Sequence, residues 1–142
     1  MAMKYKFDGF NYIVRLEKGE ELISTLAKLI QDKDIPSCWI SGLGASQKTE
    51  LGFYDIDDKE YNWKTFDEPM EILSLSGNIS WLEGKPNLHI HGSFSKRDFS
   101  SVGGHVKELV VNGTCEIFLH QWDDDKLTRS KDDNIGLNLL DL

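Results

Sequence analysis

The sequence predicts an α+β fold, in which one long amphipathic helix packs on a mostly antiparallel, curled β-sheet. Two observations predict it. Apolar residues recur at three- and four-residue steps between Glu20 and about Lys33, and this spacing is typical of a helix with a single apolar stripe. Most of the remaining segments combine β-branched and aromatic residues with turn-forming residues, as strands do. Since no repeat, low-complexity block or linker interrupts the pattern, we expect one domain over residues 1–142, with its core from about residue 10.

The first half of the chain divides into short elements. We expect a loose lead-in over residues 1–8 and a first strand over residues 12–16. Two glutamates, Glu20 and Glu21, open the helix where its dipole favours negative charge, and Pro36 ends it by about Asp34. A strand over residues 37–43 should close on Gly42 and Gly44, which indicate either a sharp turn or a close approach of another backbone. Residues 49–55 and 60–65 flank a turn and predict a hairpin.

The second half of the chain is predicted to be mostly strands. A long strand covers residues 70–81 with a bulge or bend at Gly77, and a turn leads from it into a strand at 88–94. We expect a loop over residues 96–104. The dipeptide Asn112-Gly113 predicts a hairpin that joins residues 108–111 to residues 114–122. An acidic turn at 123–125 and an apolar segment at 136–142 complete the chain. Because one helix covers only one face of so large a sheet, we expect a partner subunit to bury the remaining apolar surface.

Three of the four histidines lie close together in the sequence. His89 and His91 occupy alternate positions of the predicted strand 88–94, so they point to its polar face roughly 6.5–7 Å apart. His105 follows a glycine pair whose flexible backbone we expect to turn the third imidazole toward the other two. Such a site suits zinc or another divalent transition metal, and it leaves a position open for water or a small ligand. The alternative is a polar cluster in which serines and carboxylates satisfy the imidazoles.

Composition limits the partners of the chain. The net charge is −8, the isoelectric point is about 4.9, and the arginines are three in number: Arg15, Arg97 and Arg129. Because nucleic-acid binding depends on basic residues placed against phosphates, the surface as a whole should repel DNA. The longest apolar runs are too short to span a bilayer and no secretory leader is evident, so we expect a cytoplasmic protein. Cys38 and Cys115 are expected to be reduced, buried thiols.

A set of motifs in fixed order resembles one family. The motifs are Arg15-Leu16 with Gly19-Glu20, Ile40 to Ala45, Glu71 to Gly77, Leu88-His89-Ile90-His91, Gly103-Gly104-His105, and Gly136-Leu137 with Leu139-Leu140-Asp141. Together they resemble the plants-and-prokaryotes-conserved (PPC) domain, which accompanies AT-hooks in plant nuclear proteins and stands alone in prokaryotes. No AT-hook core occurs here, so the chain is similar to the stand-alone prokaryotic type.

The resemblance implies several properties. It implies the PPC-domain fold, a homotrimer, and the label of DNA-binding protein that stand-alone members carry. His89, His91 and His105 match the histidines of the family motif, and their retention as a set favours a bound ion.

Three functions are therefore open. The first is a trimeric assembly module with a regulatory role, which binds a metal or a small ligand at the three histidines. The second is direct DNA binding. The third is a metal-dependent enzyme, for which Glu71 or Glu116 is a candidate general base. Since no nucleophile elbow, phosphate-binding glycine loop or dinucleotide fingerprint occurs, the sequence names no substrate and favours the first function. The four tryptophans are expected in the core or at a subunit interface and not as a base-stacking platform.

Overall fold

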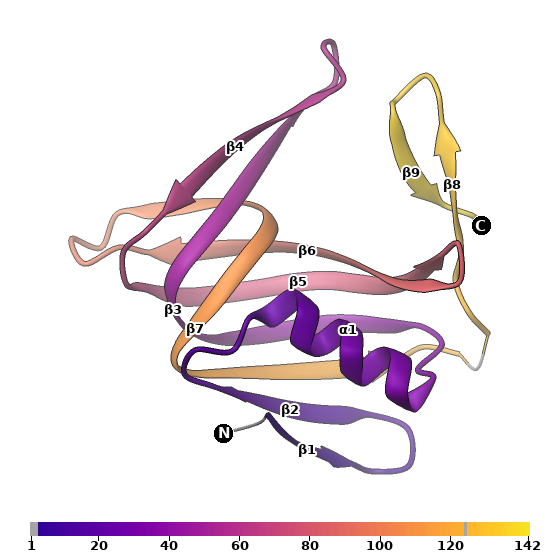
Figure 1. The fold of residues 1–142 in the computed structure, drawn as a ribbon, viewed down its shortest axis with the longest axis horizontal. Helices are drawn as coiled ribbons and strands as arrows, with labels where there is room; N and C mark the ends of the chain where they lie inside the picture. The colour runs from indigo at the N-terminus through magenta and orange to yellow at the C-terminus, as the bar shows by residue number, and fades with distance from the viewer. Residues whose placement is uncertain (1–2, 124) are drawn as a thin grey trace.

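The computed structural model describes residues 3–123 and 125–142. A seven-stranded sheet holds most of these residues, and a two-stranded hairpin follows it (Figure 1). The elements are β1 Lys4–Phe7, β2 Tyr12–Glu17, α1 Leu22–Lys33, β3 Cys38–Asp55, β4 Glu60–Phe66, β5 Met70–Leu82, β6 Lys85–Ser95, β7 Ser101–Gln121, β8 Arg129–Asp132 and β9 Leu137–Leu140. The predicted α+β class, with one helix on a mostly antiparallel sheet, is confirmed.

The large sheet curls until it closes on itself. β3 pairs with β5, β5 with β6, β6 with β7, and β7 pairs back with β3, always antiparallel. β1 and β2 extend the sheet beside the second half of β7, and β4 extends it beside the second half of β3. As a result, side chains from β3, β4, β6 and β7 meet although they lie far apart in the sequence.

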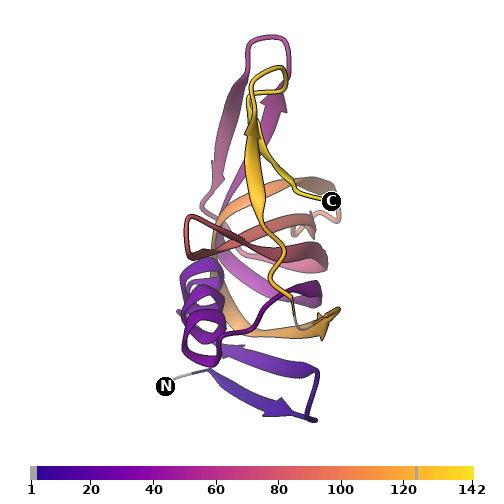
Figure 2. The ribbon, with the colours of Figure 1, turned by 90° about the vertical axis from the view of Figure 1, so that its right-hand side faces the viewer.

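Helix α1 packs on one face of the sheet, as Figure 2 shows from the side. Its buried residues are Leu22, Leu26, Leu29 and Ile30, which form the apolar stripe that the sequence predicts. The Glu21 side chain caps the first turn, where it accepts hydrogen bonds from the amides of Ile23 and Ser24. Asp34 ends the helix in a left-handed conformation with a φ of 50°. Burying each of these aliphatic side chains stabilises the fold by roughly 1.5–3 kcal/mol.

The opposite face of the sheet carries large apolar side chains that no element covers. Ile13, Trp39, Leu43 and Phe118 are each more than two-fifths exposed. They belong to one patch, because Ile13 pairs with Phe118, and Phe118 pairs with Ser41, which lies between Trp39 and Leu43 along β3. We call these four residues the apolar patch.

The C-terminal hairpin of β8 and β9 stands beside the β3–β4 hairpin (Figure 2). The Tyr54 hydroxyl donates a hydrogen bond of 2.7 Å to the carbonyl of Ile135. The Lys59 ammonium donates one of 2.6 Å to the carbonyl of Asp133. These contacts hold the end of the chain against the large sheet.

Two predictions for the first half are wrong. Of the predicted loose lead-in over residues 1–8, residues 1–2 lie outside the described residues. The rest is not loose, since β1 pairs with β2 and the ring of Phe7 stacks on that of Tyr12 at 4.4 Å. The two strands predicted over residues 37–55 are one strand, β3, and no sharp turn interrupts it. The alternative, a close approach of another backbone, is confirmed: a side chain on Gly42 would clash with the carbonyl of Glu116, and one on Gly44 with that of Thr114. Gly44 also lies at a register shift, with a φ of +151°.

Three predictions for the second half are also wrong. β7 runs without a hairpin at Asn112-Gly113, which forms an irregularity opposite the shift between Gly44 and Ser46 of β3. The bulge in β5 lies between Ile72 and Ser74, whereas Gly77 stays in register. The predicted loop over residues 96–104 ends early, because β7 begins at Ser101.

The remaining predictions have mixed outcomes. The acidic turn at 123–125 includes residue 124, which lies outside the described residues. Trp81 is buried in the core, while Trp39, Trp63 and Trp122 are exposed. Both cysteines are free and buried, as predicted, and burial raises the pKa of each thiol to about 12. In the described part of the chain, no helix is long and apolar enough to cross a membrane.

Candidate metal centre

Strand pairing brings the three histidines together. His91 on β6 and His105 on β7 are direct cross-strand partners, and His89 lies two residues from His91 on the same face. The ring centroids are 5.0 Å apart for His89 and His91, 5.5 Å for His89 and His105, and 5.6 Å for His91 and His105. One ring nitrogen from each residue lies within 4.8 Å of the other two. We call this cluster the three-histidine site.

The predicted reason for the position of His105 is wrong. The Gly103-Gly104 pair does not form a turn, because both glycines lie inside β7, opposite Ser93 and Gly92 of β6. The glycines instead allow close approach of neighbouring strands. A Cβ atom on Gly104 would lie 2.8 Å from the carbonyl oxygen of Gly52. The register of β6 against β7, and not a local bend, therefore places the third imidazole.

Aromatic rings from β4 form one wall of the site. The centroids of the Tyr61 and Trp63 rings lie 5.2 and 6.0 Å from that of His105. Gly52, the partner of His105 on β3, leaves room for both rings, since a Cβ atom there would meet the Trp63 ring and lie 2.8 Å from Cδ1 of Tyr61. Both rings therefore pack beside the His105 imidazole.

A cavity of about 230 Å³ opens between Tyr61, two residues of the three-histidine site and the C-terminal hairpin. Its lining includes His89, His105 and Arg129. The guanidinium of Arg129 is held by hydrogen bonds to Ser80 and Asn78 of β5 and to the backbone of β9. Sequence reasoning missed Arg129 as a site residue, because only the packing of the C-terminal hairpin brings it there.

The electrostatic environment favours neutral imidazoles. Burial, together with smaller effects from the neighbouring His89 and His91, lowers the pKa of His105 to about 4. Burial also lowers the pKa of His89, with smaller effects from His91 and Arg129. The Nε2 atoms of His89 and His91 are 3.2 Å apart, so one proton at most lies between them. Neutral imidazole is the form that binds a metal ion.

The donor set fits a transition-metal ion. All three donors are imidazole nitrogens, which suit zinc, copper, iron and nickel. The Nδ1 atom of His105 is buried without a hydrogen-bond partner among the described residues, and such an atom is costly unless a ligand satisfies it. In the predicted alternative, serines and carboxylates would form hydrogen bonds with the imidazoles, but Nδ1 of His105 has no such partner among the described residues.

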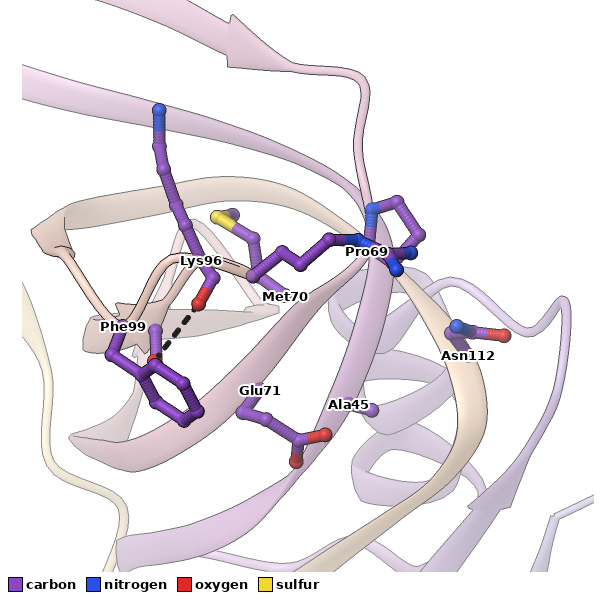
Figure 3. A pocket seen from close by; sticks show the side chains of 9 residues that line it. Ala45, Pro69, Met70, Glu71, Lys96, Phe99 and Asn112 are labelled. Atoms are coloured by element: carbon purple, nitrogen blue, oxygen red, sulfur yellow. Dashed lines mark hydrogen bonds between the residues drawn. The ribbon is translucent and has the colours of Figure 1, made fainter.

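The two candidate general bases lie elsewhere. Glu71 lines a separate hollow of about 280 Å³ beside Ala45, Met70 and Phe99 (Figure 3). It precedes Ser76, the β5 partner of His91, by five residues, or roughly 16 Å along a strand. Glu116 pairs with Arg15 and Leu43 in the second half of β7. The structure thus brings neither carboxylate to the histidines.

The protein is thus an α+β protein with a closed antiparallel sheet that carries a three-histidine site. Residues 3–123 match the family model of the Plants and Prokaryotes Conserved (PCC) domain, and the chain therefore belongs to that family. The family that the sequence motifs resemble is confirmed. No curated protein matches the chain.

Three solved structures are similar over nearly their whole length. A "putative DNA-binding protein" from Bacteroides thetaiotaomicron has a TM-score of 0.94 and 33% identity, with 99% of this chain and 98% of that chain covered. A metal-containing protein from Archaeoglobus fulgidus has a TM-score of 0.87 and 34% identity, with the same coverage of 99% and 98%. A plant- and prokaryote-conserved protein from Pyrococcus horikoshii has a TM-score of 0.87 and 28% identity, covering 99% and 94%.

Proposed function

We propose that His89, His91 and His105 hold a divalent metal ion, with zinc the first candidate, and that the chain is a regulatory, ligand-binding module. The observation that carries the proposal is the convergence of three imidazole nitrogens within 4.8 Å of one another. The buried, unpartnered Nδ1 of His105 supports it. The name of the metal-containing relative from Archaeoglobus fulgidus supports it as well. Three protein ligands leave a coordination position open, which is the arrangement of zinc sites that accept a further ligand.

The proposal includes a homotrimer, as the family resemblance implies. The apolar patch supports association between copies, because exposed clusters of large apolar side chains mark contact surfaces. The patch also lies beside the three-histidine site. Trp39 pairs with Asn78, and Asn78 pairs with His89, so the three residues share one face of the sheet. Light scattering of the purified protein should give the mass of three chains, and the mass of a single chain would contradict the trimer.

Metal analysis tests the ion directly. The protein is purified without added metal, and its metal content is measured by mass spectrometry for the wild type and for the double variant His89→Ala/His91→Ala. We expect the wild type to retain zinc in proportion to protein and the double variant to lose it. His120→Ala is the matched control, since His120 lies outside the cluster. Equal zinc content in the double variant and the wild type would overturn the proposal.

A further inference from the structure

Arg129 is held by three hydrogen bonds but has no anionic partner among the described residues. Its Nε atom donates to the hydroxyl of Ser80 at 2.7 Å, and one Nη atom donates to the side-chain oxygen of Asn78 at 2.9 Å. The other Nη atom donates to the carbonyl of Asn138 at 2.8 Å. All three acceptors are neutral. Because a guanidinium has five N–H donors, two donors remain for a further group.

No described carboxylate compensates the charge of Arg129. Among the described residues it forms no ion pair, while seven other basic side chains each pair with a carboxylate. Arg129 is partly buried, and this burial lowers its pKa. A partly buried cation without a counter-ion is costly, and in most proteins it faces an anion.

The neighbouring site would add positive charge to the same cavity. His89 and His105 line the cavity together with Arg129, and the three-histidine group includes no carboxylate. Three neutral imidazoles leave the charge of a divalent ion unreduced. With a bound ion, the cavity would carry the positive charges of Arg129 and of the metal, on a chain whose net charge is −8. A positively charged cavity of this kind attracts anions selectively.

The remaining residues of the lining indicate the chemistry of the uncharged part of the ligand. Leu137 and Leu139 of β9 add apolar residues to the lining, and Tyr61 adds an aromatic residue. The volume of about 230 Å³ is below the roughly 300–1,000 Å³ of clefts that hold drug-sized molecules. The cavity therefore suits a small molecule with one anionic end and a short apolar part.

We propose that this cavity binds a small organic carboxylate, whose charge Arg129 neutralises beside the three-histidine site. The inference rests on the proposed function, because two of the proposed metal ligands, His89 and His105, line the same cavity as Arg129. It names the chemical class of the ligand, and it gives Arg129 the role of a binding residue. Inorganic phosphate shares the charge but lacks the apolar part, so it should bind more weakly than the carboxylate.

Calorimetric titration with butanoate tests this inference. The zinc content of each protein is measured first, and zinc-loaded and metal-free samples are then titrated. We expect the zinc-loaded wild type to bind butanoate more tightly than 1-butanol or inorganic phosphate. Arg129→Met should weaken butanoate binding by at least about tenfold, because a charged hydrogen-bonding partner is lost. Lys131→Met is the control: it removes the same charge from the same strand, at an exposed side chain outside the cavity.

A second variant covers the case in which Arg129→Met does not fold. Asn87 lines the cavity, and its Nδ2 atom donates a hydrogen bond to the Ser80 hydroxyl. The same hydroxyl accepts the hydrogen bond from Arg129. Asn87→Asp preserves the shape of this side chain but places a carboxylate near the guanidinium. We expect it to weaken butanoate binding by a similar factor without changing the zinc content.

The outcomes separate the two proposals. Butanoate binding that is absent in the zinc-loaded wild type, or unchanged in both Arg129→Met and Asn87→Asp, would overturn the carboxylate inference. Binding of phosphate or 1-butanol as tight as that of butanoate would overturn it as well. If the wild type holds neither zinc nor another divalent metal ion, the proposed function fails instead. Titration of the metal-free chain then decides the role of Arg129: binding that depends on Arg129 supports it, and the lack of such binding rejects it.

Discussion

His105 has the most unusual surroundings of the three histidines. Its ring is enclosed by Tyr61, Trp63 and the two other imidazoles, and its Nδ1 atom has no partner among the described residues. Burial and the neighbouring histidines lower its pKa to about 4. The ring therefore stays neutral in the native state at pH values where free histidine is already charged.

This pKa predicts a loss of stability in mild acid for the metal-free protein. Between pH 6.5 and about 4, His105 binds a proton in the unfolded chain but not in the folded one. Because the unfolded state then holds more protons, the free energy of unfolding falls as the pH decreases through this window. We expect a loss of roughly 2 kcal/mol, after allowing for partial exposure, with His89 acting in the same direction.

Urea unfolding across this pH window, with a chelator present, measures the effect. The variant His105→Gln lacks the titrating group and should lose most of the pH dependence. His120→Gln, which replaces an exposed histidine outside the cluster, is the control. The same pH dependence in wild type and His105→Gln would contradict the prediction.

For the individual residues, the sequence predicts part of the three-histidine site. Alternation along β6 correctly places His89 and His91 on one face, because a period of two is a local property of strands. The position of His105 depends on the register between β6 and β7, which local sequence does not specify. Arg129 reaches the cavity only through tertiary packing of the C-terminal hairpin, so no spacing in the sequence indicates it.

Among the elements, α1 depends on a cap that also joins it to the sheet. The Glu21 carboxylate accepts hydrogen bonds from the amides of Ile23 and Ser24 and a further one, at 3.2 Å, from the amide of Leu109 on β7. One side chain therefore satisfies two free donors of the first helical turn and one donor of the neighbouring strand.

Removal of this carboxylate should destabilise the fold. We expect Glu21→Ala to lower the free energy of unfolding by about 1–2 kcal/mol, because three amides lose their acceptor. Glu21→Asp retains a good capping group but has a shorter reach toward Leu109, so it should lose less. Urea unfolding of both variants measures the difference. An alanine variant as stable as the wild type would show that the cap contributes nothing.

The elements also show where local patterns fail. The helix is predicted correctly, because its apolar spacing and Pro36 are local signals. Asn112-Gly113 is a strong local hairpin signal, yet β7 continues through it, with Gly113 at a φ of +83°. Pairing with β3 on both sides of this dipeptide outweighs the turn preference, and the dipeptide is accommodated as an irregularity in the ladder.

For the whole molecule, the closed arrangement of β3, β5, β6 and β7 is the feature that assembles the site. Closure depends on β7 pairing with β6 and β3 at the same time, and these pairings are non-local. The sequence therefore predicts the class of the fold and a curled sheet, but not the ladders that close it. The same closure leaves the apolar patch and the three-histidine site on one face.

The overall charge bears on the DNA-binding alternative. With a net charge of −8, the chain should not bind duplex DNA even at low salt. We expect no mobility shift at either about 50 or 200 mM salt, because nonspecific affinity comes from phosphate contacts and falls steeply with salt. A shift at low salt that disappears at high salt would restore direct DNA binding as a candidate function.

The central claim is that the three imidazoles share one metal ion. Anomalous diffraction from crystals of protein purified without added metal, recorded on both sides of the zinc absorption edge, tests it most directly. We predict a peak at the meeting point of His89, His91 and His105, at roughly 2.0–2.1 Å from one nitrogen of each ring, that weakens sharply below the edge. Imidazoles that bind only to each other or to water, with no anomalous peak between them, would contradict the claim.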